Sequence, residues 1–428
     1  MATAWQRIRA RERIVALGET GLGDRDLRRQ VLTLLGGVIS FDWYAWLLTD
    51  PVTTVGTAPL AEVPRIGELP ALIKAKYATT VNRWTDLLLR ASPIGLLTVA
   101  TGGDVGRSRV WREVVSRDGV GDVASMIFAD QYGCWGFLDL WRAAARGPFE
   151  PVDADYLASL AAPLTSALRQ SQARTFTEPA AAHRRDTAPV VLTLDDGLRI
   201  TSRTAVSQAW LNVLLPPEPN VQAIPASVYN VAAQLLAAEA GIDDHPAVTR
   251  THLAGGFWLT LRAARLAAEQ PAASGGGAGA TIVVTIEEAS AADRLDLFGR
   301  AFGLSVRERE LLSLLAIGSD TRSLARQMSL SEHTVQDHLK AIFAKTGARD
   351  RIALLSRALG TRHGVTDDGS GARGWPAVRL DGERLKAATT RPMPGSESHG
   401  DLAAITSRAQ RLVVARAGDL RPAASCAY

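Results

Sequence analysis

A series of short, well-capped helix patterns between residues 303 and 360 constrains the fold of this chain more than any other feature. Ser305 and Glu308 form a capping box, in which the serine accepts a hydrogen bond from a backbone N–H and the glutamate reaches back to the cap. Asp320 is a good N-cap for a second helix, and Ser331 caps a third. We therefore expect an all-α unit with a tight turn between its second and third helices.

The third helix of this unit divides into an apolar stripe and a polar stripe. The apolar stripe has the spacing i, i+4, i+7, i+8 and consists of Val335, Leu339, Ile342 and Phe343. The polar stripe consists of His333, Gln336, Asp337 and Lys340. Two helices joined by a tight turn, the second with a polar outward face, can place that helix in the major groove of DNA. Capped helical units also occur as plain packing modules, so the pattern alone leaves both interpretations open.

A fourth helix is expected from 350 to 359, with Ile352, Leu355 and Leu359 buried. Between 303 and 360 there are nine Lys or Arg and six Asp or Glu residues, a difference of +3. Only some of these cations can face phosphates. We therefore expect modest affinity from one copy and DNA binding by a homodimer.

At these residues the segment resembles the LuxR/FixJ family of four-helix DNA-binding domains. The family's opening Leu-Thr-x-Arg-Glu-x-Glu stands here as Leu-Ser-Val-Arg-Glu-Arg-Glu at 304–310, and its Leu-Leu-Ala-x-Gly is at 314–318. Its Ser-x-x-Thr-Val-x-x-His-Leu is at 331–339, and its closing Gly-x-Arg-Asp-Arg is at 347–351. The resemblance implies a helix-turn-helix domain over 299–360.

The resemblance also implies roles for single side chains. Gln336, Asp337 and Lys340 would face base edges, and the helix 350–359 would pair two protomers. The other expected DNA-binding residues, several of them near phosphates, are Thr321, Arg322, Ser331, Thr334 and His338. The family commonly has lysine where Gln336 stands and a neutral residue where Asp337 stands. Gln can read adenine and Asp can accept from cytosine, but a carboxylate near phosphates weakens binding, so we expect unusual base specificity.

Residues 1–175 are expected to form an α+β domain. Helix patterns lie near both ends, and a hairpin rich in β-branched and aromatic residues spans 124–142 around a glycine-containing turn. This order, with the closing segment FEPVDADYLASLAAPLTSAL, resembles a GAF domain. Strand alternation places Trp135, Phe137 and Trp141 on one face and Leu138 and Leu140 on the other, which predicts a sheet covered on both faces.

Seven of the ten tryptophans lie before residue 142. Aromatic side chains on a sheet could line a ligand pocket, and the candidates are Trp43, Trp46, Trp135 and Trp141. Large aromatic residues also serve as ordinary core.

Residues 189–298 resemble, more weakly, a PAS-like α+β domain. VVLTLDDGLRI predicts a strand and turn, a helix follows at 227–240, and two strand runs lie at 255–266 and 280–289. The glycines at 275–279 lack the Lys-Ser/Thr of a phosphate-binding loop, so we interpret them as a hairpin loop. The expected fold is thus multidomain, with α+β GAF- and PAS-like sensor domains before an all-α LuxR-type domain.

The segment 361–428 has few apolar residues and is predicted to be mostly disordered. Helix-turn-helix units of this type usually close the chain, so the extension is a departure from the family. It could be inert, add a phosphate-binding arm, or mask the recognition helix.

Composition excludes several classes of protein. The two cysteines, Cys134 and Cys426, form neither a disulfide framework nor a metal cluster, which suits the cytoplasm. The most apolar stretch, 31–48, contains Asp42 and is not expected to enter a membrane. No catalytic constellation, cofactor motif or phosphorylated receiver cluster is present, so we expect no enzyme activity, cofactor or metal.

These patterns predict a one-component transcription regulator, in which sensor domains respond to a small molecule or partner and control promoter binding. The alternative is an interaction protein whose sensor-like domains bind only other proteins. A co-purified metabolite would separate the two hypotheses.

Overall fold

The computed structural model describes residues 3–178, 190–205, 207, 225–253, 257–266 and 281–360. The chain divides into two compact units, Met1–Gly364 and Val365–Tyr428, and every described residue belongs to the first. The segment 361–428 and the glycines at 275–279 lie outside the described residues, and so their predictions stay predictions.

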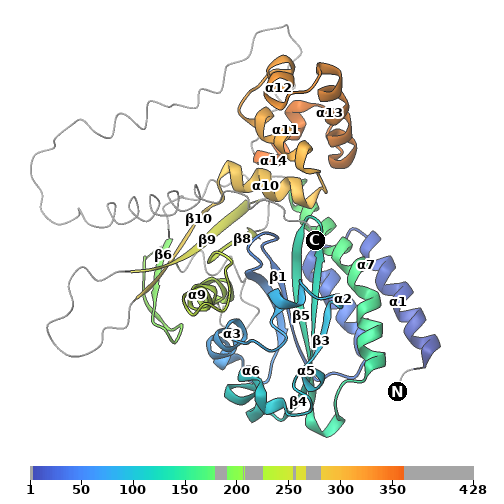
Figure 1. Ribbon diagram of the computed structural model, residues 1–428, viewed down its shortest axis with the longest axis vertical. Coiled ribbons are helices and arrows are strands. Elements are labelled where there is room, and N and C mark those ends of the chain that lie inside the picture. Colours follow the sequence, from blue (N-terminus) through green and yellow to red (C-terminus); the bar gives the residue numbers. More distant parts are fainter. Residues whose placement is uncertain are drawn as a thin grey trace, which may run out of the picture. The chain divides into compact units, whose positions relative to one another are not determined.

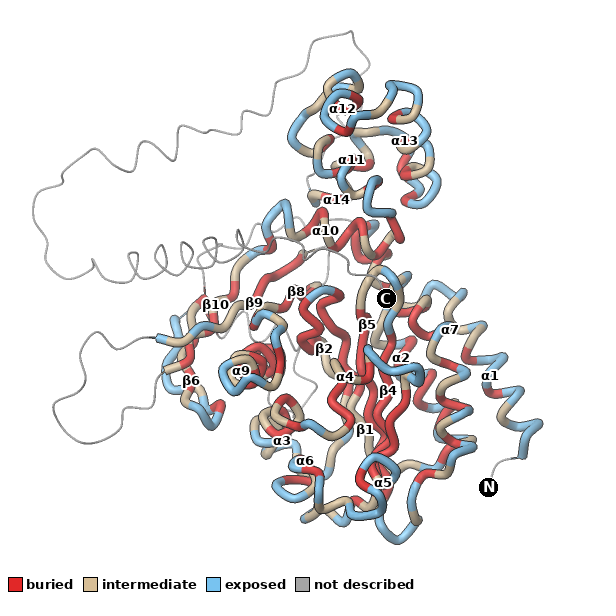
Figure 2. The backbone as a smooth tube through the Cα atoms, viewed as in Figure 1, coloured by how far each residue is buried: buried red, intermediate tan, exposed pale blue. Residues whose placement is uncertain are grey.

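The first domain is built on an antiparallel sheet of five strands in the order β2-β1-β5-β4-β3 (Figure 1). The strands are β1 (Trp43–Thr49), β2 (Gly56–Glu62), β3 (Ile94–Leu96), β4 (Val120–Asp130) and β5 (Gly133–Ala143). The two longest strands, β4 and β5, form the hairpin that the sequence predicts. Its strands are buried along almost their whole length (Figure 2).

Helices cover both faces of this sheet, as predicted. One face is covered by α1 (Ala4–Glu19), α2 (Asp24–Gly36) and α7 (Pro151–Thr175). The other face carries α3 (Leu69–Tyr77), α4 (Trp84–Leu87), α5 (Leu97–Ala100) and α6 (Arg109–Glu113). Short 3₁₀ turns lie at Ile66–Glu68, Val105–Arg107, Val115–Asp118 and Ala144–Arg146.

The predicted faces of β5 are correct except at Trp135. Phe128 pairs with Gly136 and Ala129 with Cys134, so Trp135 has no partner on β4 and forms a β-bulge. A bulge reverses the alternation of side chains on its strand. Trp135 consequently packs with Leu138 under α7, opposite the face predicted for it.

The second domain repeats the strand order of the first. Its antiparallel sheet runs β7-β6-β10-β9-β8, so in both sheets the first and last strands lie inside and the second and third lie at the edges. The strands are β6 (Val190–Leu194), β7 (Ile200–Arg203), β8 (Val248–Leu253), β9 (Phe257–Arg265) and β10 (Ile282–Glu288).

Helix α9 (Ala226–Glu239) joins the cores of the two domains. It packs on β9 and β10 and also contacts α3 and β2 of the first domain (Figure 1). Val231 on α9 shares a buried cluster with Tyr77 and Phe137 of the first domain. The two sheets are therefore not independently packed.

Five helices complete the described chain and confirm the predicted helical C-terminal unit. They are α10 (Ala291–Ala301), α11 (Val306–Ala316), α12 (Thr321–Met328), α13 (Glu332–Thr346) and α14 (Arg351–Leu359). The boundary predicted between 298 and 299 falls inside α10, which packs against α11 and α14.

Candidate nucleic-acid interface

The capping box predicted for α11 is present. Ser305 Oγ accepts from the Glu308 N–H at 3.2 Å, and Glu308 Oε2 accepts from the Ser305 N–H at 2.6 Å. The same oxygen accepts from Lys345 Nζ of α13 at 2.6 Å. Burial would raise the pKa of the Glu308 carboxyl, but these hydrogen bonds outweigh it and hold that pKa below its ordinary value. The contact fixes α13 to α11.

The turn between α12 and α13 depends on a left-handed residue. Ser329 has φ +55°, and the Leu330 N–H returns to the Ala325 carbonyl at 2.8 Å. Asp320 caps the start of α12 by accepting from the Ser323 N–H at 2.7 Å. The turn itself takes three residues, 329–331, between the end of α12 and the start of α13, as the sequence predicts.

Helix α13 shows the two predicted stripes. Ser331 caps its first turn by accepting from the Thr334 N–H at 3.1 Å. Val335, Leu339 and Ile342 are buried, and Phe343 packs against the same core.

The opposite stripe of α13 faces solvent. Gln336, Asp337 and Lys340 are exposed. Lys340 Nζ donates to Asp337 Oδ1 at 3.0 Å, and His333 Nε2 lies 3.5 Å from the other carboxylate oxygen. The hydrogen bond from Lys340 is the main reason why the pKa of Asp337 is lowered. A cation and an anion that are both expected at base edges thus neutralise each other in the free protein.

The remaining predicted DNA-binding residues flank this stripe. Arg322 and Ser331 are exposed, whereas Thr321, Thr334 and His338 are half-buried. The Thr321 hydroxyl accepts from Arg351 of α14 at 2.7 Å, which no sequence pattern indicated. The pairing of Lys345 with Glu308 was likewise not predicted, because both contacts join residues at least 30 positions apart.

Helix α14 buries a different face from the predicted one. Leu354 and Ala358 are buried, whereas Ile352 is 39% exposed and Leu355 and Leu359 are half-buried. The prediction of a buried Ile352 is wrong, and Leu355 and Leu359 pack against the core only in part. The reason is that α14 packs on α10 with Leu354 and Ala358 as its fully buried residues. An apolar edge of α14 is therefore left partly open.

Helix α10 connects the helical unit to both sheet domains. Arg294 Nε donates to the Ala358 carbonyl of α14 at 3.3 Å. Arg300 Nη1 donates at 2.9 Å to the carbonyl of Tyr132 in the β4–β5 turn. Sequence reasoning did not predict α10, although Ser290, which accepts from the Asp293 N–H at 3.1 Å, is a recognisable N-cap.

The four candidate tryptophans lie on two sides of the first sheet. Trp46 and Trp135 belong to the core under α7, where Trp46 stacks on Phe128 with centroids 5.2 Å apart. Trp43 and Trp141 lie on the opposite face. Their assignment as ligand-binding residues stays a prediction.

Trp141 lines a cavity of about 20 Å³ on that opposite face. Asp139, 2% exposed, accepts there from Lys76 at 2.7 Å, from Ser125 at 2.7 Å and from Trp84 at 3.3 Å. In the described part of the chain, no three His, Cys, Asp or Glu side chains are grouped so as to hold a metal ion. Nor does any described helix have the length and apolarity needed to cross a membrane.

Comparison with known proteins gives a family match for the helical unit. The model for bacterial regulatory proteins of the luxR family matches residues 303–358. The chain is 36% identical over 91 residues to the probable HTH-type transcriptional regulator GfsR of Streptomyces halstedii, which covers 19% of this chain and 37% of that protein. It is 33% identical over 63 residues to the transcriptional regulatory protein DesR of Bacillus subtilis, covering 15% and 32%. The matches span about a third of these relatives.

Solved structures give looser matches. Escherichia coli SdiA is 12% identical with a TM-score of 0.27, over 82% of this chain and 96% of that one. A Vibrio cholerae VqmA dimer is 16% identical with a TM-score of 0.15, over 41% and 84%. The family assignment therefore rests on 303–358.

Proposed function

Residues 303–358 form a helix-turn-helix domain of the bacterial luxR regulatory family, and from this premise we propose that the chain is a one-component transcription regulator that binds double-stranded promoter DNA. The observation that carries the proposal is the outward stripe of α13. It is exposed, it holds only polar side chains, and its helix is fixed from behind by Val335, Leu339 and the Lys345–Glu308 ion pair. A rigid helix with such a face suits the major groove.

In this proposal the exposed side chains of α13 read bases. Gln336 is suited to adenine, Asp337 accepts from cytosine N4, and Lys340 donates to guanine. Near the phosphates stand Thr321, Arg322, Ser331, Thr334 and His338. Phosphate contacts set the register of the helix, and the three base-reading side chains set the sequence.

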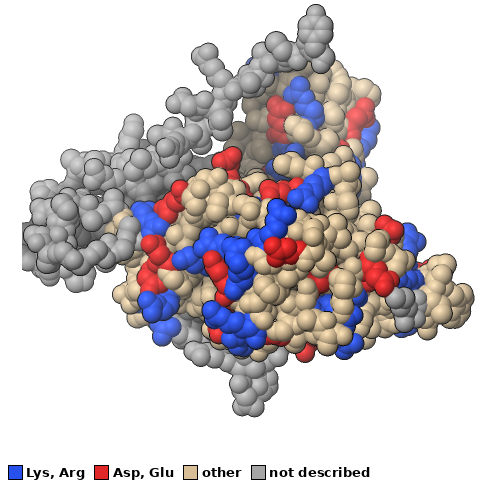
Figure 3. All heavy atoms as spheres, turned by 60° about the horizontal axis from the view of Figure 1, so that its bottom comes forward, with Lys and Arg blue, Asp and Glu red and all other residues tan. Residues whose placement is uncertain are grey.

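We propose further that the protein binds DNA as a homodimer, through α14 and the sensor region. The partly open apolar edge of α14, formed by Ile352, Leu355 and Leu359, supports pairing there. The modest charge also favours two copies: the whole chain carries +4, and Figure 3 shows cations and anions interspersed over the face in view.

The two sheet domains are proposed to be GAF-like and PAS-like sensors of a small molecule or partner. Their shared strand order supports a common type of domain. Mass spectrometry of the extract released by denaturing the purified protein tests this: a stoichiometric metabolite supports it, and a ligand-free protein that still responds to a protein partner favours the interaction alternative.

The DNA-binding proposal is tested by titrating the full chain onto labelled DNA from upstream of its own gene at two salt concentrations. Lys340→Ala is expected to weaken binding by about tenfold, the size of one base contact. Arg117→Ala is the matched control, since it removes one exposed cation from the first domain. Binding that is unaffected by Lys340→Ala would remove α13 as the reading face, and no binding at either salt would contradict the function.

A further inference from the structure

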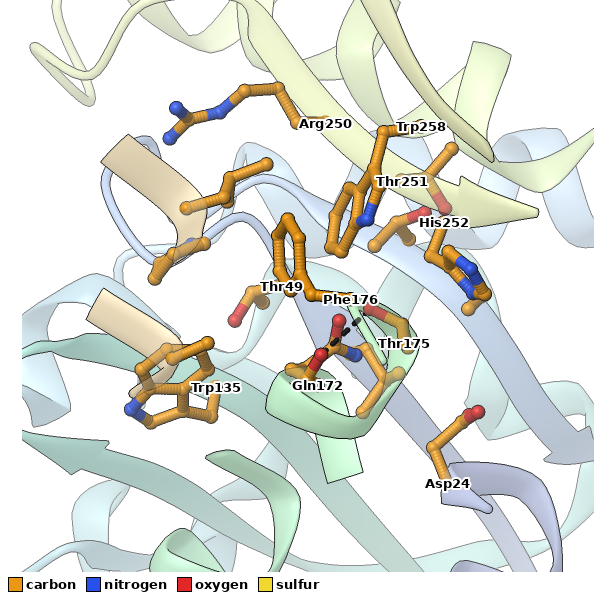
Figure 4. Close-up of a pocket in the computed structure, with 16 residues that line it drawn as sticks. Asp24, Thr49, Trp135, Gln172, Thr175, Phe176, Arg250, Thr251, His252 and Trp258 are labelled. Carbon is orange, nitrogen blue, oxygen red and sulfur yellow. Dashed lines mark hydrogen bonds between the residues drawn. The ribbon is translucent and has the colours of Figure 1, made fainter. Parts of the chain in front are cut away.

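A second cavity, of about 40 Å³, lies where the two sheet domains and α10 meet. Trp135 and Phe176 line it from the first domain, Thr251, His252 and Trp258 from β8 and β9, and Leu297 from α10. Figure 4 shows Trp258 and Phe176 side by side in this space, with His252 on the side of Trp258 that is away from Phe176. The DNA-binding function makes no direct use of it.

Two buried polar atoms at this cavity have no hydrogen-bond partner. Trp258 is 3% exposed, and its Nε1 donor is unpaired. Nε2 of His252 is also unpaired, since Glu178 Oε2 lies 3.8 Å away, beyond hydrogen-bonding distance. The indole nitrogen is on the side of the ring that faces Thr251 and His252 (Figure 4). Buried donors are almost always satisfied, so two unpaired groups on one cavity indicate a missing partner.

The cavity is electrically neutral. Arg250 is held by Asp50 at 2.8 Å and by Asp296 at 3.1 Å, and Asp24 is paired with Arg28 at 2.6 Å. Burial lowers the pKa of His252 to about 4, so its ring is uncharged at neutral pH. A charged ligand would find no counter-charge here, whereas a neutral molecule with an acceptor oxygen would satisfy the indole donor.

The size of the cavity and its aromatic walls also limit which ligands can bind. Trp258 and Phe176 stack with centroids 5.3 Å apart and present an aromatic wall. Since a single water needs about 10–15 Å³, the cavity holds about three groups of that size. Two of the residues that line the cavity, His252 and Asp24, are partly exposed to solvent.

We propose that this cavity binds a small neutral carbonyl compound, such as a short amide, ester or ketone, whose oxygen accepts from Trp258 Nε1–H. Its carbon atoms lie against Phe176 and Leu297, and His252 supplies the second hydrogen bond.

Occupancy of the cavity is transmitted to the helical unit through α10. Phe176 packs edge-on against Phe298 of α10, with centroids 5.4 Å apart, and lies under the guanidinium of Arg294 at 5.5 Å. Arg294 in turn donates to α14 at Ala358. This regulatory part rests on the proposed DNA-binding function, whereas ligand binding itself does not.

The test is an NMR titration of the full chain, with ¹⁵N-labelled indoles and no DNA, using acetamide, which has three groups of the required size, as the probe. Trp258→Phe keeps an aromatic ring and identifies the Trp258 resonance by its loss. We expect this resonance to shift downfield and saturate. Trp135 lines the same cavity but already donates to Asp130 at 2.9 Å, so its resonance is the internal control. Acetate, the charged counterpart, is expected to give no saturable shift.

A Trp258 resonance that does not respond, or a linear drift shared by all indoles, would overturn the ligand site. Repeating the DNA titration with acetamide then tests regulation: the affinity for DNA should change in the wild type and not in Trp258→Phe. If the indole shifts but the DNA affinity does not change, the site stands and the regulatory role is wrong. If no DNA binds at all, it is the proposed function that fails.

Discussion

Asp337 and Lys340 stand three positions apart on α13 and form an ion pair that is open to solvent. An exposed pair of this kind contributes little to stability. Its importance lies in recognition. When the helix enters the groove, the ion pair must break so that each side chain can bind a base edge. The pair thereby raises the cost of binding a sequence that does not satisfy both side chains.

Asp337→Asn is expected to tighten binding to unrelated DNA by several-fold, because it frees Lys340 and removes a charge that repels phosphates. Discrimination between the operator and unrelated DNA should fall by about 1–3 kcal/mol, the size of one base contact. Fluorescence anisotropy on both DNAs measures this. Glu310→Gln, which makes the same charge change on α11, should leave discrimination intact. Equal effects of the two variants would contradict a reading role for Asp337.

His252 makes stability depend on pH. Burial is the largest cause of its lowered pKa, and Asp24 and Arg294 act on it in opposite senses, with Glu178 3.8 Å away. Between its ordinary pKa of 6.5 and about 4, the unfolded chain binds a proton that the folded chain does not. Stability therefore falls as pH drops through this window, by about 1.4 kcal/mol per unit.

Denaturant titrations between pH 7 and pH 5 would measure this dependence, and His252→Gln should remove about 2 kcal/mol of it. His333→Gln, at an exposed site, is the control. A His252→Gln profile parallel to that of the wild type would show that the ring is not buried as a neutral group.

At the residue scale, the sequence could predict the features that depend only on residues close together in the chain. The caps at Ser305, Asp320 and Ser331 are read from positions three apart, and all three are present. The exposed stripe of α13 follows from helical periodicity in the same way. The partners of Lys345 and Thr321 could not be predicted, because they come from other helices and depend on how these pack.

Among the elements, the errors occur where tertiary packing overrides a regular pattern. The bulge at Trp135 reverses the alternation of side chains along β5. The residue types from 133 to 137 do not indicate that a bulge occurs there. On α14 the periodicity allowed two apolar faces, and docking on α10 selected the one with Leu354 and Ala358. β8 was missed because its sequence, VTRTHL, lacks a continuous apolar run.

Ser329→Gly is expected to stabilise the helix-turn-helix. Serine at φ +55° carries the strain of the left-handed region, which glycine relieves, for a net gain of about 0.5–1 kcal/mol after the entropy of the unfolded chain. Chemical denaturation followed through the helical signal measures it. Ser313→Gly, inside α11, should destabilise by about 0.5 kcal/mol. A loss of stability in Ser329→Gly would show that the turn is not strained.

Across the whole first unit, Arg250 is a residue of the second domain that contacts both the first domain and α10. It extends from β8 to Asp50, which is fully buried in the first domain, and to Asp296 on α10. Removing one member of a buried ion pair leaves the other without compensation. The buried ion pairs Arg250–Asp50 and Arg83–Asp243 both join the two sheet domains. The first is also a contact to α10, the helix that leads into the DNA-binding unit.

Arg250→Met should lower stability by about 3–5 kcal/mol and split unfolding into separate transitions, because Asp50 is left buried and unpaired. Scanning calorimetry distinguishes separate unfolding transitions from a single one. Arg262→Met, on β9 with a half-exposed partner at 3.5 Å, should retain the wild-type profile. A single, merely shifted transition in Arg250→Met would show that the shared core around α9 suffices to couple the domains.

The Asp337–Lys340 pair also affects how DNA binding depends on salt concentration. Cations that meet phosphates normally set free the small ions condensed on the duplex, and the salt dependence of binding counts them. A lysine that arrives with its own carboxylate brings an internal counterion. Each copy of the protein should therefore release fewer ions than its basic residues suggest and keep more of its affinity as the ionic strength of the cell rises.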